Sequence, residues 1–168
     1  MNVPASATNE TLMRSSLLLP YVRSSALFRC PADAVLIGGK PRMRNYSMNG
    51  WVGTRHMETF QNQRNFRTFA RESETSVKAS LLWTIADEDA ATIDDSFFLV
   101  TMDDSQPFAS FPGARHRGSY VLSFIDGHVE AWKLLDQSFK SGGPQGGGNR
   151  NGVDWIRLKQ ATTVAWGQ

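Results

Sequence analysis

The feature that most constrains the fold is the dipeptide Asp126-Gly127, which lies between two alternating runs of aromatic and β-branched residues, 119–125 and 128–134. Because Asp-Gly tolerates the positive φ angles of a type I′ turn, the segment predicts a β-hairpin with a two-residue loop. That loop sets the register, and opposed residues point to the same face. The predicted core face is Tyr120, Leu122, Phe124, Val129 and Ala131. The other, mixed face is Val121, Ser123, Ile125, His128, Glu130 and Trp132.

The same hairpin limits the chemistry open to the histidines. Seven strand residues span about 20 Å at about 3.3 Å each, so His116 and Asp126 are expected at opposite ends of the hairpin. A catalytic dyad or compact metal centre built from His116, Asp126 and His128 needs hydrogen-bonding or ligation distances, which an unbroken strand forbids for His116. We therefore interpret Asp126 and Gly127 as turn residues and the histidines as hydrogen-bonded structural residues.

Several stretches occur in an order that is similar to one bacterial family. His116, nine further residues and then Asp126-Gly127 resemble the H-x9-DG domain of pseudopilin-like proteins, whose precursors carry a prepilin-type cleavage and methylation sequence. Leu27-Phe-Arg-Cys30-Pro31-Ala-Asp33, followed by Asn45-Tyr46-Ser-Met-Asn49, is similar to the family's "fRCPsD…sYsmN" series. Residues 86–98 resemble its "DE…sIdDgyF" segment, and 154–158 its terminal helix.

The resemblance implies a structural, non-enzymatic protein, namely the globular head of a type II secretion or type IV pilus-like pseudopilin. Its partners would be other pseudopilin or pilus-like subunits, and its location the periplasmic or extracellular face of the cell envelope. Members begin with about twenty apolar residues, whereas the longest apolar run near this start is Leu17 to Leu19. We therefore expect membrane attachment only through an N-terminal helix that is absent from this chain.

Composition favours one domain over residues 1–168. A chain of 168 residues that is 40% hydrophobic and 11% aromatic can bury a single core. Fourteen glycines and seven prolines predict many loops, and the glycine-rich run 141–151 predicts a flexible loop. A net charge of +2 is too small to argue for nucleic acid as a partner.

The expected fold class is α+β, with an antiparallel sheet that ends in the Asp-Gly hairpin. A short helix over 10–19 is predicted, capped by Asn9 and ended by Pro20. A second helix is predicted over 153–161, capped by Asn151. The other predicted strands cover 46–52, 76–86 and 97–102.

Five carboxylates gather between residues 87 and 95, and besides plain solvation two accounts of them remain open. One is a hard cation such as calcium, the one cofactor we consider, held by Asp87, Glu88, Asp94 and Asp95. The other is neutralisation by the basic stretch Arg115-His116-Arg117.

The remaining candidate residues suggest weaker hypotheses. Cys30, which precedes Pro31, is the only cysteine, so an internal disulfide is excluded, and we interpret it as a small buried hydrophobic residue. Five tryptophans could form a sugar-binding platform in a carbohydrate- or ligand-binding envelope module. A metal-dependent hydrolase could use the carboxylates with His116 or His128, but no hydrolase motif is present.

Overall fold

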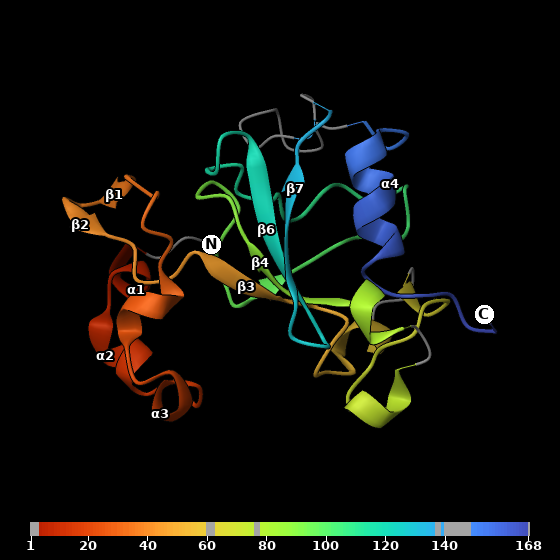
Figure 1. Ribbon diagram of the computed structural model, residues 1–168, viewed down its shortest axis with the longest axis horizontal. Helices are drawn as coiled ribbons and strands as arrows, with labels where there is room; N and C mark the ends of the chain where they lie inside the picture. The colour runs from red at the N-terminus through yellow and green to blue at the C-terminus, as the bar shows by residue number, and fades with distance from the viewer. Residues whose placement is uncertain (1–3, 60–62, 76–77, 137–138, 140–148, 168) are drawn as a thin grey trace.

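The computed structural model describes residues 4–59, 63–75, 78–136, 139 and 149–167, and its centre is a five-stranded sheet of order β5-β3-β4-β6-β7 (Figure 1). Neighbouring strands are antiparallel except β3 and β5, which are parallel. The predicted α+β class is confirmed, with one parallel pair that the sequence did not predict. The strands are β3 (Tyr46–Asn49), β4 (Trp83–Asp87), β5 (Phe97–Phe98), β6 (Ser119–Phe124) and β7 (Val129–Lys133).

Helices flank this sheet on two sides. The N-terminal segment lies on one side, with a small two-stranded sheet of its own, and the last helix lies on the other (Figure 1). The α-helices are α1 (Pro4–Ala7), α2 (Glu10–Arg14), α3 (Leu19–Val22) and α4 (Val153–Gln160). The small sheet pairs β1 (Leu36–Ile37) with β2 (Lys40–Pro41). Short 3-10 helices are η1 (Ser25–Phe28), η2 (His56–Thr59), η4 (Glu72–Glu74) and η5 (Ala79–Leu81).

The predicted N-terminal helix is shorter than expected. Its cap is confirmed, because Asn9 Oδ1 accepts a hydrogen bond from the Thr11 amide at 2.9 Å. The helix ends at Arg14, however, and Pro20 lies in the first turn of α3. A proline is tolerated there because the amide it lacks would have no partner within the helix. Pro20 therefore begins a helix and does not end one.

The C-terminal helix is present, but its predicted cap is wrong. Gly152 is the N-cap residue of α4, and no side chain caps the helix. The helix start is held instead by Asp154, which is fully buried and whose Oδ2 accepts a hydrogen bond from the Leu135 amide at 2.7 Å. Most of the predicted glycine-rich loop, residues 141–148, lies outside the described residues.

The predicted strands are shorter in the structure. The strand predicted from Tyr46 ends at Asn49, whose Oδ1 accepts a hydrogen bond from the Trp51 amide at 3.0 Å and turns the chain. Asn49 Nδ2 also donates to the carbonyls of Trp83 and Thr162, which lie in distant segments. The strand predicted over 97–102 is reduced to β5, and η5 occupies part of the strand predicted over 76–86.

One aromatic core lies between the sheet and α4. Trp51, Trp83 and Trp155 are all at most 1% exposed, and Trp155 meets Phe108 edge-to-face at 4.4 Å between ring centroids. Such pairs add about 0.5–1.5 kcal/mol to the energy of burial. The alternation predicted for β6 is confirmed, since Tyr120, Leu122 and Phe124 are buried. The rest of the chain packs around this core, which also includes Phe98, Val100, Leu134, Phe139 and Leu158.

The hairpin forms where it was predicted, but its register differs by one residue. Ser123 pairs with Val129 and Tyr120 with Trp132, where the prediction put Phe124 opposite Val129. A one-residue change exchanges the two faces of a strand. Val129 is consequently 62% exposed, while Trp132 packs edge-to-face on Tyr120 with 6.0 Å between ring centroids.

The difference arises because the loop has three residues, Ile125, Asp126 and Gly127. Phe124 and His128 close it, since the Phe124 amide donates to the His128 carbonyl at 2.9 Å. Gly127 has a φ of 89° and Asp126 has no positive φ, so the turn is type I followed by a left-handed glycine. The Ile125 amide donates to the Leu82 carbonyl at 3.0 Å, a contact with the residue just before β4. That bond continues the antiparallel β4–β6 pairing by one residue, so Ile125 stays joined to the β4 side while it leaves the pairing with β7.

A first prediction concerns this loop. Replacing Gly127 by Ala should lower the free energy of unfolding by about 1–2 kcal/mol, because a Cβ is disfavoured at that positive φ. The matched variant Gly127→Asn should cost less, since Asn enters the left-handed region more readily. Urea unfolding measures both. Equal stability of the Ala variant and the parent protein would contradict the observed turn.

Candidate functional site

Three strand ends meet at one edge of the sheet and form the base of the site. Asp87, the last residue of β4, pairs with Tyr46, the first residue of β3. Because β6 is antiparallel to β4, the residues that precede β6 also reach this edge. The Gly113 amide donates to the Asp87 carbonyl at 2.8 Å. Segments far apart in the sequence are therefore adjacent around Asp87.

The N-terminal segment joins this edge through Asn45. The Cys30 amide donates to Asn45 Oδ1 at 2.9 Å, and Asn45 Nδ2 donates to Asp33 Oδ2 at 2.6 Å. Cys30 and Asp33 are linked by a turn around Pro31, in which the Asp33 amide donates to the Cys30 carbonyl at 3.1 Å. Cys30, Asp33 and Asn45 are at most 3% exposed. The Asn45 side chain thus provides hydrogen bonds to two buried polar groups of the N-terminal segment, the Cys30 amide and the Asp33 carboxylate.

Arg115 neutralises the carboxylates of Asp33 and Asp87, where the N-terminal segment meets the sheet. Its Nη1 hydrogen-bonds Asp87 Oδ1, its Nη2 donates to the Glu88 carbonyl at 2.8 Å, and its Nε lies 3.6 Å from Asp33 Oδ1. A Cβ on Gly113 would lie 2.1 Å from Arg115 Nη1, so a glycine makes room for the guanidinium. The predicted pairing of the basic stretch with Asp87 is confirmed for Arg115. We use the name Asp87 cluster for Cys30, Asp33, Asn45, Asp87, Arg115 and His116.

His116 completes the Asp87 cluster. A tight turn over residues 116–119, with positive φ at Arg117 and Gly118, places it just before β6. Its Nε2 lies 3.4 Å from Cys30 Sγ and 3.5 Å from Asp87 Oδ2, and its side chain is 36% exposed. The contact between Cys30 and His116 was not predicted. Both residues lie in segments that resemble the pseudopilin-like family, but nothing in those segments indicates that the two side chains are in contact.

The geometry of these contacts does not match a nucleophilic Cys-His-Asp arrangement. In such a triad the carboxylate binds one ring nitrogen of the histidine while the other nitrogen faces the thiol. Here Cys30 and Asp87 both approach the same nitrogen, His116 Nε2. The interpretation of Cys30 as a buried residue agrees with its 0% exposure.

The acidic stretch is divided between two environments. Asp87 and Glu88 are buried, whereas Asp94 and Asp95 are exposed. Among the described residues, one group of three or more potential ligand side chains converges, and it is Cys30, Asp87 and His116. The four carboxylates predicted to hold calcium are therefore not brought to one point.

Burial dominates the electrostatics of Asp87 and Glu88. It raises the pKa of Asp87 to about 6, although the charge of Arg115 opposes the shift. It raises the pKa of Glu88 to about 7, although the hydroxyls of Ser47, Ser110 and Thr92 favour the ionised carboxylate.

The hairpin residues form a separate, exposed group at the other end of β6. Asp126 Oδ1 lies 2.5 Å from His128 Nδ1, and the His128 ring stacks on Phe124 at 4.3 Å between centroids. The hydrogen bond that His128 donates to the Asp126 carboxylate raises the pKa of His128. Since His116 contacts Cys30 and Asp87, each of these two histidines has its own carboxylate, in agreement with the predicted separation of His116 and Asp126.

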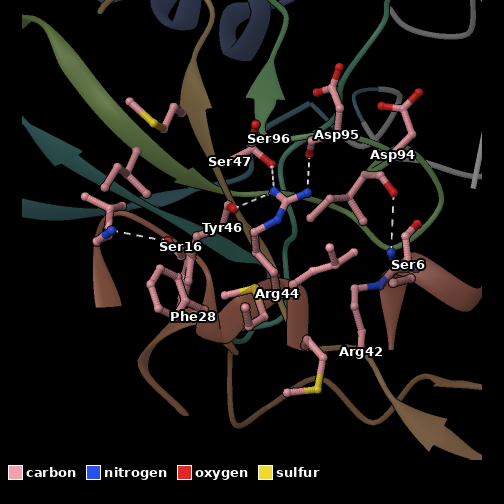
Figure 2. Close-up of a pocket in the computed structure, with 18 of the residues that line it drawn as sticks. Ser6, Ser16, Phe28, Arg42, Arg44, Tyr46, Ser47, Asp94, Asp95 and Ser96 are labelled. Atoms are coloured by element: carbon pink, nitrogen blue, oxygen red, sulfur yellow. Dashed lines mark hydrogen bonds between the residues drawn. The ribbon is translucent and has the colours of Figure 1, made fainter. Parts of the chain in front are cut away.

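An apolar groove of about 720 Å³ separates the N-terminal segment from the face of β3 and β4 (Figure 2). Arg44 crosses its floor, where Nη1 donates to the Tyr46 carbonyl at 2.8 Å and to Ser47 Oγ at 2.9 Å. Asp94 and Asp95 belong to the wall on the side of Ser96. The apolar lining consists of Leu12, Met13, Leu17, Leu18, Phe28, Met43, Met48, Ile85 and Ile93.

The tryptophans do not assemble a sugar platform. Trp51, Trp83 and Trp155 are in the core, Trp132 is half-buried against Tyr120, and Trp166 is exposed. A platform needs several exposed aromatic faces in one row, which these positions do not provide.

Comparison with known proteins identifies no relative: no family model matches the chain, and neither curated proteins nor solved structures match it. The resemblance to pseudopilin-like proteins therefore stays a prediction. In the part of the chain that the structure describes, no helix has both the length and the apolar character needed to cross a membrane.

A second prediction tests the Arg115 pairing. Replacing Arg115 by Met should lower the free energy of unfolding by about 3–5 kcal/mol, because it leaves Asp33 and Asp87 buried without their cation. The matched variant is Arg117→Met, which makes the same change at an exposed neighbour and should have little effect. Chemical denaturation near neutral pH measures both, and an equal effect of the two substitutions would contradict the pairing.

A third prediction concerns Glu88. Its folded pKa is raised to about 7, so its contribution to stability is present below the unfolded pKa and is lost as pH rises through about 7. The pKa of Glu88 rises from an ordinary value of 4.5 to about 7, and each pKa unit corresponds to about 1.4 kcal/mol. The stability lost is therefore about 3 kcal/mol. Glu88→Gln should remove this part of the pH dependence between about pH 4.5 and 8. Denaturation at several pH values measures it, and the exposed Glu72→Gln is the control; identical pH profiles for Glu88→Gln and the parent would refute it.

Proposed function

We propose that the protein is the non-enzymatic globular head of a pseudopilin-like subunit of the cell envelope, and that it contacts neighbouring subunits through its N-terminal segment. The observation that carries this proposal is a concentration of exposed apolar side chains. Seven of the sixteen large hydrophobic residues that are exposed in the described chain lie between residues 12 and 36. We call these seven the apolar N-terminal surface: Leu12, Leu17, Leu18, Tyr21, Leu27, Val35 and Leu36.

Some side chains of the apolar N-terminal surface are almost fully exposed to solvent. Leu17 is 88% exposed and Tyr21 is 84% exposed, and both lie within four residues of each other in the chain. Single exposed hydrophobic residues are normal, but several large ones within one short segment favour an interaction site, and Leu12, Leu17 and Leu18 also line one groove. The groove beside this surface extends the apolar area towards Met48 and Ile85 on the sheet.

The Asp87 cluster supplies the rigidity that such a surface needs. Its buried hydrogen bonds join the N-terminal segment at Cys30 and Asp33 to the sheet at Asn45 and Arg115. An interface that is held in place before binding loses less conformational entropy when it binds. A second copy of this chain is the partner we propose, because pilus-like assemblies are built from like subunits.

A fourth prediction tests this interface by self-association. The parent protein should sediment as a concentration-dependent oligomer, and Leu17→Asp combined with Tyr21→Asp should weaken association by about 10- to 100-fold. Because both side chains are exposed, the melting temperature should not change in dilute solution, where the parent protein is monomeric. The control is Val153→Asp, at an apolar residue that is 50% exposed on α4. A monomeric parent protein, or an unchanged double variant, would contradict the proposal.

Cross-linking provides a direct readout of the same contact. Cys30 is the only cysteine and is fully buried, so an introduced thiol would be the accessible one. Leu17→Cys should form disulfide-linked dimers under mild oxidation, and Val153→Cys should not. Equal dimer yields from the two variants would argue against a specific N-terminal interface.

A further inference from the structure

The Asp87 cluster has the features of a metal centre. Cys30 Sγ, His116 Nε2 and a carboxylate oxygen of Asp87 lie within 4.8 Å of one another. They are contributed by the N-terminal segment, the turn before β6 and the end of β4. A thiol, an imidazole and a carboxylate that converge in this way are the usual ligands of zinc.

The two distances from His116 Nε2 to the other ligand atoms agree with a shared ion. Zinc bonds of about 2.3 Å to sulfur and about 2.0–2.1 Å to nitrogen or oxygen, at tetrahedral angles, place adjacent ligand atoms about 3.3–3.6 Å apart. His116 Nε2 is 3.4 Å from Cys30 Sγ and 3.5 Å from Asp87 Oδ2. The same ring nitrogen faces both partners, as a ligand in one coordination shell does.

A second observation points to a ligand at Asp87. The Asp87 side chain is 0% exposed, its Oδ1 hydrogen-bonds Arg115, and its Oδ2 has no hydrogen-bond partner in the structure. A buried carboxylate oxygen without a partner costs free energy. This oxygen is the one directed at His116 Nε2, so a cation between them would satisfy it.

The surroundings hold the ligands in place. Arg115 fixes the Asp87 carboxylate, and Asn45 fixes the Cys30 backbone and Asp33. Partners of this kind orient ligands and tune affinity in metal sites. The charges around the site also suit a divalent ion. The negative charges of a Cys30 thiolate, Asp87 and Asp33 would balance the charges of the ion and of Arg115.

We propose that Cys30, Asp87 and His116 bind one zinc ion, with water as the fourth ligand, and that the ion clamps the N-terminal segment to the sheet. A thiolate and an imidazole favour zinc over calcium, which prefers oxygen ligands. The Cys30 thiol loses its proton to solvent when the ion binds. His116, which is 36% exposed, provides access for the ion and for the water. This site does not depend on the proposed subunit function.

Titration of the tag-free protein with zinc chloride tests the proposal. Calorimetry should show one ion per chain, and cobalt(II) should give a thiolate-to-metal charge-transfer absorption band in the near ultraviolet. Cys30→Ser should abolish that band, and His116→Ala should weaken zinc binding by more than about 100-fold, the upper range for losing only a supporting residue. The matched control is His128→Ala, which removes a histidine at the other end of β6 and should bind zinc as the parent does.

A thermal measurement separates lost binding from lost folding. Circular dichroism of the variants without metal should match that of the parent, and saturating zinc should raise the melting temperature of the parent and of His128→Ala only. Absence of one-to-one binding by the parent would overturn the proposal. So would parent-like affinity in both ligand variants, or an equal loss in His128→Ala.

Discussion

The buried ion pair between Arg115 and Asp87 is the interaction on which the arrangement of this protein depends. The guanidinium also reaches Asp33 and the Glu88 carbonyl, so one side chain connects the N-terminal segment, the end of β4 and the turn before β6. Without it, two carboxylates would be buried without a counter-charge at the junction. Buried pairs of this kind are weak sources of net stability, but removing one partner is costly. The pair therefore specifies how the segments are joined more than it stabilises the fold.

The stability of the domain comes mainly from its aromatic core and not from this ion pair. The aromatic core around Trp51, Trp83 and Trp155 buries large apolar surfaces against the sheet and α4. The Asp87 cluster lies at one edge of this sheet, where the strand ends leave polar groups that must find partners. Asn45, Asp33 and Arg115 provide most of them, while Asp87 Oδ2 accepts no hydrogen bond. The core thus stabilises the scaffold, and the cluster provides the side chains of the proposed zinc site.

The proposed subunit surface and the proposed zinc site rest on different observations, but both involve the same part of the chain. Both concern the N-terminal segment, which has few buried side chains of its own and leaves Leu17 and Tyr21 in solvent. Such a segment needs an attachment to the sheet before it can present a defined face. Hydrogen bonds at Asn45 and the Asp87 cluster provide that attachment, and an ion shared by Cys30, Asp87 and His116 would strengthen it.

Local sequence determined the features that depend on neighbouring residues alone. These are the hairpin around Asp126-Gly127, the buried alternation of β6, the Asn9 cap and the existence of α4. Tertiary structure decided the rest, because the deciding partners are distant in the chain. Ile125 belongs to the loop, where its amide bonds the distant Leu82 carbonyl, and in the resulting register Trp132 and not Val129 faces the core. Cys30 and His116 are 86 residues apart, and only the antiparallel order of β3, β4 and β6 brings them together beside Asp87.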